Sequence, residues 1–291
     1  MANLKEIKNR ITSISSTMQI TSAMKMVSAA KLKKAQDAIT QMRPYSNKLQ
    51  ELLGNLSATT DISENPYSEI RQESNILVLA ISSNRGLCGG FNNNVIKKVN
   101  ELVNKTYANT NVNIICFGKK VTDAFRRSDI RIDNKEVGSE DIFSNLTFAN
   151  AAEIAENVTA LFLNKKFDKV VVIYNSFVNA SVQDVKAEQL LPIAPMTNDA
   201  SSTNVEYIFE PSKSEIIEDL IPKSLKTQFF KALLDSHASE HGARMTAMHK
   251  ATDNAKELKR TLTLSYNKAR QAAITNEILE IVGGAEALKG N

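Results

Sequence analysis

The spacing of apolar residues predicts a long helix at each end of the chain. In residues 1–56 the intervals alternate between three and four positions, which is the seam spacing of a coiled coil. The seam positions are Leu4, Ile7, Ile11, Ile14 and Met18, then Leu32, Ala35, Ile39 and Met42. The rhythm resumes after Pro44, at Tyr45, Leu49, Leu52 and Leu56, so we expect a kink at this proline and no break in the helix.

The last part of the chain, from residue 223, has the same rhythm. The positions that follow this rhythm are Leu225, Phe229, Leu233, His241, Met245, Met248, Thr252, Ala255, Leu258 and Leu262, and finally Ile274, Ile278 and Ile281. No proline and a single glycine, Gly242, interrupt residues 223–282. We expect this helix to end at Gly283–Gly284.

Between the two helical ends the period changes to that of buried strands. Apolar, β-branched runs occupy Ile76–Ile81, Val112–Phe117 and Val170–Tyr174, and the intervening stretches 92–106, 119–127 and 148–166 are helix-like. This alternation indicates an α/β domain with an open, mostly parallel sheet. Weaker runs at Phe177–Val185 and Tyr207–Phe209 are candidate edge strands.

Charge divides the chain at the same places. Residues 1–56 carry nine basic and three acidic side chains, residues 223–291 carry eleven and seven, and residues 57–222 carry sixteen and twenty-two. A basic helical rod therefore joins an acidic domain. Helices of these lengths would extend about 80–90 Å, whereas a 166-residue domain has a radius of gyration of about 15 Å, so we expect the rod to project and to offer apolar surface to another protein.

Cysteine usage and hydropathy exclude several classes of protein. Cys88 and Cys116 lie 28 positions apart, which suits neither a disulfide framework nor a metal site, and we expect two reduced, buried thiols. No stretch reaches the roughly 18 consecutive apolar residues of a membrane span.

The segment Ser82–Asn92, SSNRGLCGGFN, is the most enzyme-like feature of the chain. It follows the first strand and opens a helix, so its backbone amides could cradle a phosphate. It has no P-loop lysine and no full dinucleotide fingerprint, and a tight strand-to-helix turn is the alternative. A nucleotide-dependent enzyme using Arg85–Phe91 therefore remains a competing hypothesis.

Two further patterns each have a chemical and a structural interpretation. His237, Glu240 and His241 form H-x-x-E-H, which could place two imidazoles on a metal, or could supply seam and surface histidines on the two-helix rod. Basic positions such as Lys25, Lys31, Lys33 and Lys34 could bind nucleic acid, face solvent or meet an acidic protein. A coiled-coil nucleic-acid-binding protein is thus a second competing hypothesis.

Taken together, three stretches closely resemble the gamma subunit of F-type ATP synthases of the bacterial type. They are MANLKEIKNRITSISSTMQITSAMKMVSAAKLKKAQ at the start, RGLCGGFN after the first strand, and SEHGARMTAMHKATDNA with LTLSYNKARQAAITNEILEIVGGAEAL at the end. The histidines of HASEH and Lys256–Glu257 depart from the family pattern, and the cysteine-bearing insertion of chloroplast members is missing. Since the likeness begins within the first few residues, we expect no transit peptide.

The resemblance implies a central rotor shaft. The terminal helices would form a long antiparallel coiled coil inside a hexamer of alpha and beta subunits, and the inserted, Rossmann-like α/β domain would meet the epsilon subunit and the c-subunit ring. Rotation driven by proton flow would then open and close the nucleotide sites of the beta subunits in turn. It implies a coupling subunit that is not an enzyme, with no cofactor, no metal and no nucleic acid, peripheral to the cytoplasmic face of the bacterial plasma membrane.

The same resemblance implies particular contact residues. Met24, Arg244, Arg270, Gln271 and Thr275 match family positions that meet acidic lever and catch loops of the beta subunits. Tyr207, Phe209 and Glu210 match the segment that meets the c-ring. The implied divisions are 1–56 for the N-terminal shaft helix, 57–222 for the α/β domain and 223–291 for the C-terminal shaft helix.

Overall fold

A computed structural model describes residues 4–59, 65–128, 130–134, 142–193 and 213–289. Its contacts divide the chain into two compact units, one formed by Met1–Val27 with Met245–Asn291 and the other by Ser28–Arg244. The element order is α1 (Leu4–Thr59), η2 (Pro66–Ser68), β1 (Asn75–Ile81), α2 (Phe91–Glu101), η3 (Leu102–Thr106), β2 (Asn111–Phe117), α3 (Lys119–Phe125), β3 (Arg131–Ile132), η5 (Ile142–Ser144), α4 (Phe148–Leu163), β4 (Lys169–Phe177), β5 (Gln183–Leu191) and α5 (Lys213–Lys289).

The two predicted terminal helices are present as α1 and α5. Helix α1 continues through Pro44, as expected. Helix α5 begins at Lys213, ten residues before the predicted start, and contains Pro222. The predicted end at Gly283–Gly284 is wrong, because α5 runs on to Lys289. Each glycine weakens a helix by only about 1 kcal/mol relative to alanine, and the strong helix formers that follow sustain it.

The sheet lies in the Ser28–Arg244 unit and has five strands in the order β3-β2-β1-β4-β5. Strands β1 to β4 run parallel to one another, and the edge strand β5 pairs with β4 in the antiparallel sense. The open, mostly parallel α/β domain is therefore confirmed. The two-residue edge strand β3 was not predicted, because so short a run carries no periodicity.

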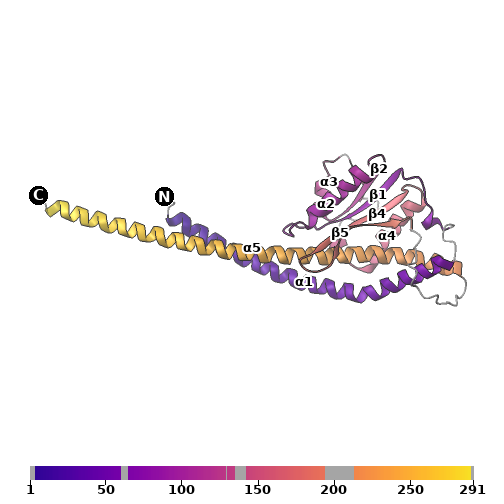
Figure 1. Cartoon of the computed structure of the whole chain (residues 1–291), viewed down its shortest axis with the longest axis horizontal. Helices are drawn as coiled ribbons and strands as arrows, with labels where there is room; N and C mark the ends of the chain where they lie inside the picture. The colour runs from indigo at the N-terminus through magenta and orange to yellow at the C-terminus, as the bar shows by residue number, and fades with distance from the viewer. Residues whose placement is uncertain (1–3, 60–64, 129, 135–141, 194–212, 290–291) are drawn as a thin grey trace. The chain divides into compact units, whose positions relative to one another are not determined.

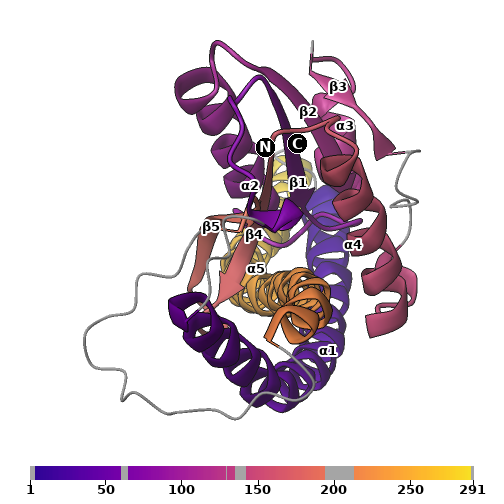
Figure 2. The ribbon, with the colours of Figure 1, turned by 90° about the vertical axis from the view of Figure 1, so that its right-hand side faces the viewer.

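Alternate side chains of β1 pack into two separate hydrophobic cores, one on each face of the sheet. Leu77, Leu79 and Ile81 pack with residues of α4 and α5. Ile76, Val78 and Ala80 pack with residues of α2 and α3. Figures 1 and 2 show the sheet between these two helical layers. Burial on both faces explains why β1 is a continuous apolar run.

The predicted edge strand Phe177–Val185 is corrected to a hairpin between β4 and β5. The turn forms because the Asn179 side-chain oxygen accepts hydrogen bonds from the backbone amides of Ser181 (2.9 Å) and Val182 (2.8 Å). The other candidate edge strand, Tyr207–Phe209, lies outside the described residues.

One glycine is required by a close backbone approach. Gly118, between β2 and α3, has φ +98°, and a Cβ there would lie 2.4 Å from the carbonyl oxygen of Ser82. The Ser82 hydroxyl in turn accepts a hydrogen bond from the amide of Val121 in α3 (3.1 Å). This packing fixes the first turn of α3 against the carboxyl end of β1.

None of the described helices combines the length and apolarity needed to cross a bilayer.

Candidate functional site

The N-terminal part of α1 and the C-terminal part of α5 form an antiparallel pair with polar ties across its seam. The Thr252 hydroxyl donates to the Thr21 hydroxyl (2.8 Å), and the Lys259 ammonium donates to the Ser15 hydroxyl (3.1 Å). Ile7, Thr21, Met248 and Ala255 are buried in this unit. The predicted antiparallel coiled coil is therefore present here.

The register of this pair leaves the end of α5 without a partner helix among the described residues. Since Thr21 lies opposite Thr252 and Ser15 opposite Lys259, the first described residue of α1, Leu4, falls near Arg270. All of residues 271–286 are exposed. This stretch carries five large apolar side chains that are 47–67% exposed: Ile274, Ile278, Leu279, Ile281 and Val282. Ile274, Ile278 and Ile281, which continue the predicted seam rhythm, are therefore not buried within this chain, and the expectation that the rod offers apolar surface agrees with their exposure.

The predicted shaft contacts lie on this unit, with the exception of Arg244. Met24 is half-buried, and nearby Ile20, Met26 and Val27 are 58–64% exposed. Arg270, Gln271 and Thr275 are exposed. Tyr207, Phe209 and Glu210 lie outside the described residues.

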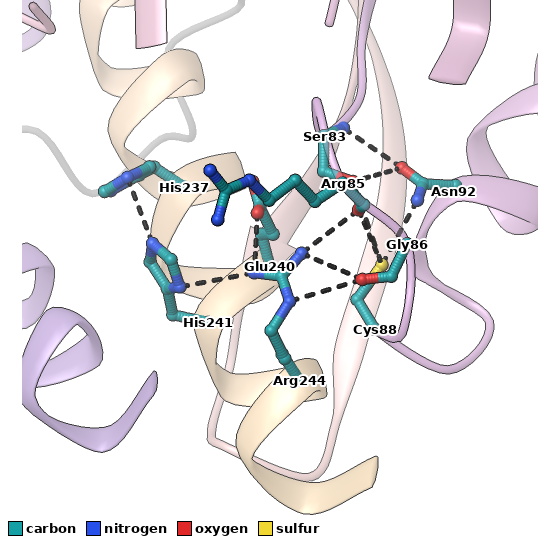
Figure 3. A network of polar contacts seen from close by, with 9 residues as sticks. All are labelled: Ser83, Arg85, Gly86, Cys88, Asn92, His237, Glu240, His241 and Arg244. Atoms are coloured by element: carbon teal, nitrogen blue, oxygen red, sulfur yellow. Dashed lines mark hydrogen bonds and ion pairs between the residues drawn. The ribbon is translucent and has the colours of Figure 1, made fainter. Parts of the chain in front are cut away.

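Arg244 instead lies inside the Ser28–Arg244 unit, with its side chain 8% exposed. Its Nη1 group donates to Glu240 Oε1 (2.7 Å) within α5. Its Nη2 group donates to the carbonyl oxygens of Arg85 (3.1 Å) and Gly86 (3.3 Å), and Nε donates to Gly86 (3.4 Å). The guanidinium thus ties α5 to the loop between β1 and α2 (Figure 3).

The same guanidinium sets the tautomers of two histidines. An arginine N–H can only donate, so His241 Nδ1, 3.4 Å from Arg244 Nη1, is an acceptor. The proton of His241 is therefore on Nε2, which donates to His237 Nε2 at 3.2 Å. Burial lowers the pKa of His237 to about 4 and that of His241 to about 3, with Lys31 and Arg244 acting in the same direction. Both rings are neutral at neutral pH.

These positions correct the prediction of histidines on a bare two-helix rod. His241 is buried, and His237 is half-buried and stacks on Phe143 (ring centroids 6.3 Å apart). Small residues on α5 allow the close approach: the Ser239 hydroxyl donates to the Asn175 carbonyl (3.0 Å), and a Cβ on Gly242 would lie 3.2 Å from Ala180. Glu240 turns to Arg244, and no group of three possible metal ligands occurs among the described residues.

Several polar groups of the loop between β1 and α2 have partners inside the chain. Two of its carbonyls accept from Arg244, the Ser83 amide donates to the Asn92 side-chain oxygen (3.0 Å), and the Phe91 amide donates to the carbonyl oxygen of Cys88 (3.3 Å). A phosphate cradle needs outward amide donors. This arrangement favours the tight strand-to-helix turn over the nucleotide site.

Both cysteines are free and buried, as predicted. Burial raises the pKa of Cys88, and it raises that of Cys116 to about 12. The Cys88 thiol receives a hydrogen bond from the Asn92 amide nitrogen (3.1 Å) and packs with Phe91 and Ala243.

The contact between Arg244 and the loop was missed by sequence reasoning. A signal was available, because Glu240 and Arg244 are four positions apart within a run of apolar and small residues. Such a pair indicates a buried ion pair, but its loop partners are backbone carbonyls, which no side-chain pattern identifies.

The family model described as ATP synthase matches residues 3–288. Curated relatives are the ATP synthase gamma chains of Flavobacterium johnsoniae, 61% identical over the full length of both chains, and of Chlorobaculum tepidum, 47% identical over 99% of this chain and 100% of the relative. The chain belongs to the ATP synthase gamma-chain family. The sequence resemblance is confirmed, and the family gives no support to the competing nucleic-acid and enzyme hypotheses.

Solved structures agree with the fold. A chain from the central stalk and c-ring of the Tetrahymena thermophila mitochondrial ATP synthase is 28% identical, with a TM-score of 0.58, covering 80% of this chain and 99% of that one. A chain of the Euglena gracilis mitochondrial ATP synthase is 21% identical, with a TM-score of 0.68, covering 98% and 94%. Long terminal helices around a mostly parallel sheet are thus the fold of this family.

Proposed function

We propose that the chain is the central rotor shaft of a proton-translocating ATP synthase. It couples rotation of a membrane c-ring to the cycling of the catalytic sites in the beta subunits, and it makes or breaks no bond itself. The solved relatives that support this role are described as central stalk, rotor and c-ring chains.

The observation that carries the proposal is the uncovered apolar end of α5. Ile274, Ile278, Leu279, Ile281 and Val282 are each about half exposed or more, on a helix stretch with no described partner in the chain. Exposed apolar surface of this extent marks a protein interface. An enclosing ring of alpha and beta subunits would cover it.

The contact residues follow from this placement. Met24, Arg270, Gln271 and Thr275 are available on the coiled-coil unit to meet the beta subunits. Tyr207, Phe209 and Glu210 stay a prediction for the c-ring contact. The proposal keeps the division of the chain at residues 56–57 and 222–223 into two shaft helices and an α/β domain. It also holds that this domain binds the epsilon subunit and the ring. The protein would be peripheral to the cytoplasmic face of the bacterial plasma membrane.

Affinity purification of the tagged full chain from its native membranes tests the function. We expect stoichiometric alpha, beta, epsilon and c subunits, and recovery of none of them would refute the proposal. Calorimetry addresses the competing enzyme: micromolar affinity of the isolated chain for a nucleotide would contradict a non-catalytic shaft.

A further inference from the structure

The loop between β1 and α2 is held in a conformation that its own residues do not favour. Leu87 has φ +62°, in the left-handed region, and its side chain is 64% exposed. A leucine in the left-handed backbone region is strained, and because Leu87 is exposed, its burial does not offset the strain. Contacts to the neighbouring residues are therefore needed to hold this conformation.

Arg244 is the group that contacts the loop at the required place. Its Nε and Nη2 groups donate to the carbonyls of Arg85 and Gly86, the two residues that precede Leu87. The Ser83 hydroxyl also donates to Arg85 O, and the Ser83 backbone amide donates to the Asn92 side-chain oxygen at the base of the loop. Three donors of one rigid guanidinium thus converge on two consecutive carbonyls.

The forked guanidinium of Arg244, here called the fork, is also held on the side that faces away from the loop. Nη1 is bound by Glu240 Oε1 at 2.7 Å and lies 3.4 Å from His241 Nδ1, so all three nitrogens of Arg244 have partners inside the unit. A planar, doubly anchored guanidinium has no free donor for an external carboxylate. These bonds argue against a direct contact between Arg244 and a beta subunit.

We propose that Arg244 is a positioning residue: it pins the β1–α2 loop to the part of α5 that lies in the Ser28–Arg244 unit and holds the loop in its observed conformation. Its relevance to rotary coupling rests on the proposed function. The pin itself is a property of the chain alone.

The labelling rate of the Cys88 thiol measures whether Arg244 holds the loop closed. It lies in the loop, is 2% exposed, and packs with Phe91 of α2 and Ala243 of α5 beside Arg244. Cys116, also 2% exposed, lies in β2 and serves as an internal control for unfolding of the sheet. Because the charge of Arg244 lowers the pKa of Cys88 against the larger effect of burial, removing that charge alone would slow thiol labelling. Faster labelling therefore signals opening of the loop.

The experiment measures maleimide labelling of each cysteine at pH 8 by mass spectrometry, using the full chain. The test variant is Glu240→Gln/Arg244→Met, which removes the fork without leaving a buried carboxylate unpaired. We expect Cys88 to label at least tenfold faster with Cys116 unchanged. Arg244→Lys, which keeps one donor group, should give an intermediate rate and serves as the test if the double variant does not fold.

Two controls keep the fork. Glu240→Gln retains the carbonyl contacts, and Arg270→Met removes an exposed arginine from the same helix, so both should leave Cys88 protected. Unchanged Cys88 labelling in the double variant would overturn the pin. Parallel acceleration of both cysteines would also overturn it, because that result reports global destabilisation.

Coupling is measured separately in membranes carrying the assembled complex. The double variant should pump fewer protons per ATP hydrolysed than Glu240→Gln. An equal number of protons pumped per ATP in the two variants, with Cys88 labelled fast in the double variant, would refute the role of the Arg244 contact in rotation. It would not refute the contact itself. Failure to recover the partner subunits would instead refute the proposed function and leave the labelling result standing.

Discussion

The buried histidine pair makes the stability of the sheet unit depend on pH. His241 is 5% exposed and donates to His237, and Lys31, Lys34 and Arg244 surround the two rings. Protonation of either ring would break the hydrogen-bond chain and place a cation among these positive charges. We expect the pair to destabilise the folded state as the pH falls from 7.5 to 5.

The sign and size follow from the pKa differences. In the unfolded chain both rings have the ordinary pKa of 6.5, whereas in the folded chain the values are about 4 for His237 and about 3 for His241. The unfolded state therefore binds more protons below pH 6.5, and stability falls with pH in that window. Between pH 7.5 and 5 each ring contributes a loss of about 2 kcal/mol, or about 4 kcal/mol if the two rings act independently.

Buried carboxyl groups act in the opposite direction. Burial raises the pKa of Asp235 from 3.8 to about 6, and it raises that of Glu240 despite the Arg244 ion pair. Their folded state takes up protons more readily, so both groups oppose the histidine effect as the pH falls, and Asp235 does so below about pH 6. The net pH dependence of the wild type therefore understates the histidine effect, and only a comparison of variants isolates it.

The assay is urea unfolding at pH 7.5 and pH 5, followed by pulse hydrogen–deuterium exchange on peptides from β1 and β4. His237→Gln/His241→Gln should lose 2–4 kcal/mol less stability than the wild type across this pH change. His249→Gln is the matched control, since this third histidine is 57% exposed and belongs to the other unit. Equal losses in the wild type and the double variant would refute the reasoning.

Three further outcomes are expected. Gly118→Ala should destabilise the sheet by more than about 3 kcal/mol in urea unfolding, because φ +98° and the 2.4 Å approach to the Ser82 carbonyl oxygen both exclude a Cβ. Gly89→Ala is the control, since it has open space around it, and it should cost about 1 kcal/mol. Met24→Lys should lower the ratio of proton pumping to ATP hydrolysis in membranes, since an ion pair of about 1 kcal/mol in one rotary state slows departure from that state about fivefold. Met24→Leu should leave the ratio nearly unchanged. Equal ratios for both variants would leave Met24 as a packing residue. Arg270→Glu should lower ATP synthesis by the assembled complex about tenfold if a contact of about 1.5 kcal/mol is lost, and an unchanged rate would remove Arg270 from the contact set.

The sequence by itself determined the elements and the family. Three and four spacing predicted α1 and most of α5, and the continuous apolar runs predicted β1, β2 and β4, because regular periodicity is a local property that burial imposes on each element. The motifs TSAMKM and GARMTAM identified the family before any tertiary contact was known.

Tertiary structure decided what the side chains of those motifs do. The apolar positions Ile274 and Ile278 continue the seam pattern, yet they are exposed because the paired register brings Leu4 only as far as Arg270. Arg244 has the motif position of an external contact, but its nitrogens bind Glu240 and two carbonyls of a loop about 160 positions earlier. Backbone carbonyls are present at every residue and leave no mark in a sequence, so only the folded chain shows which of them a buried arginine meets.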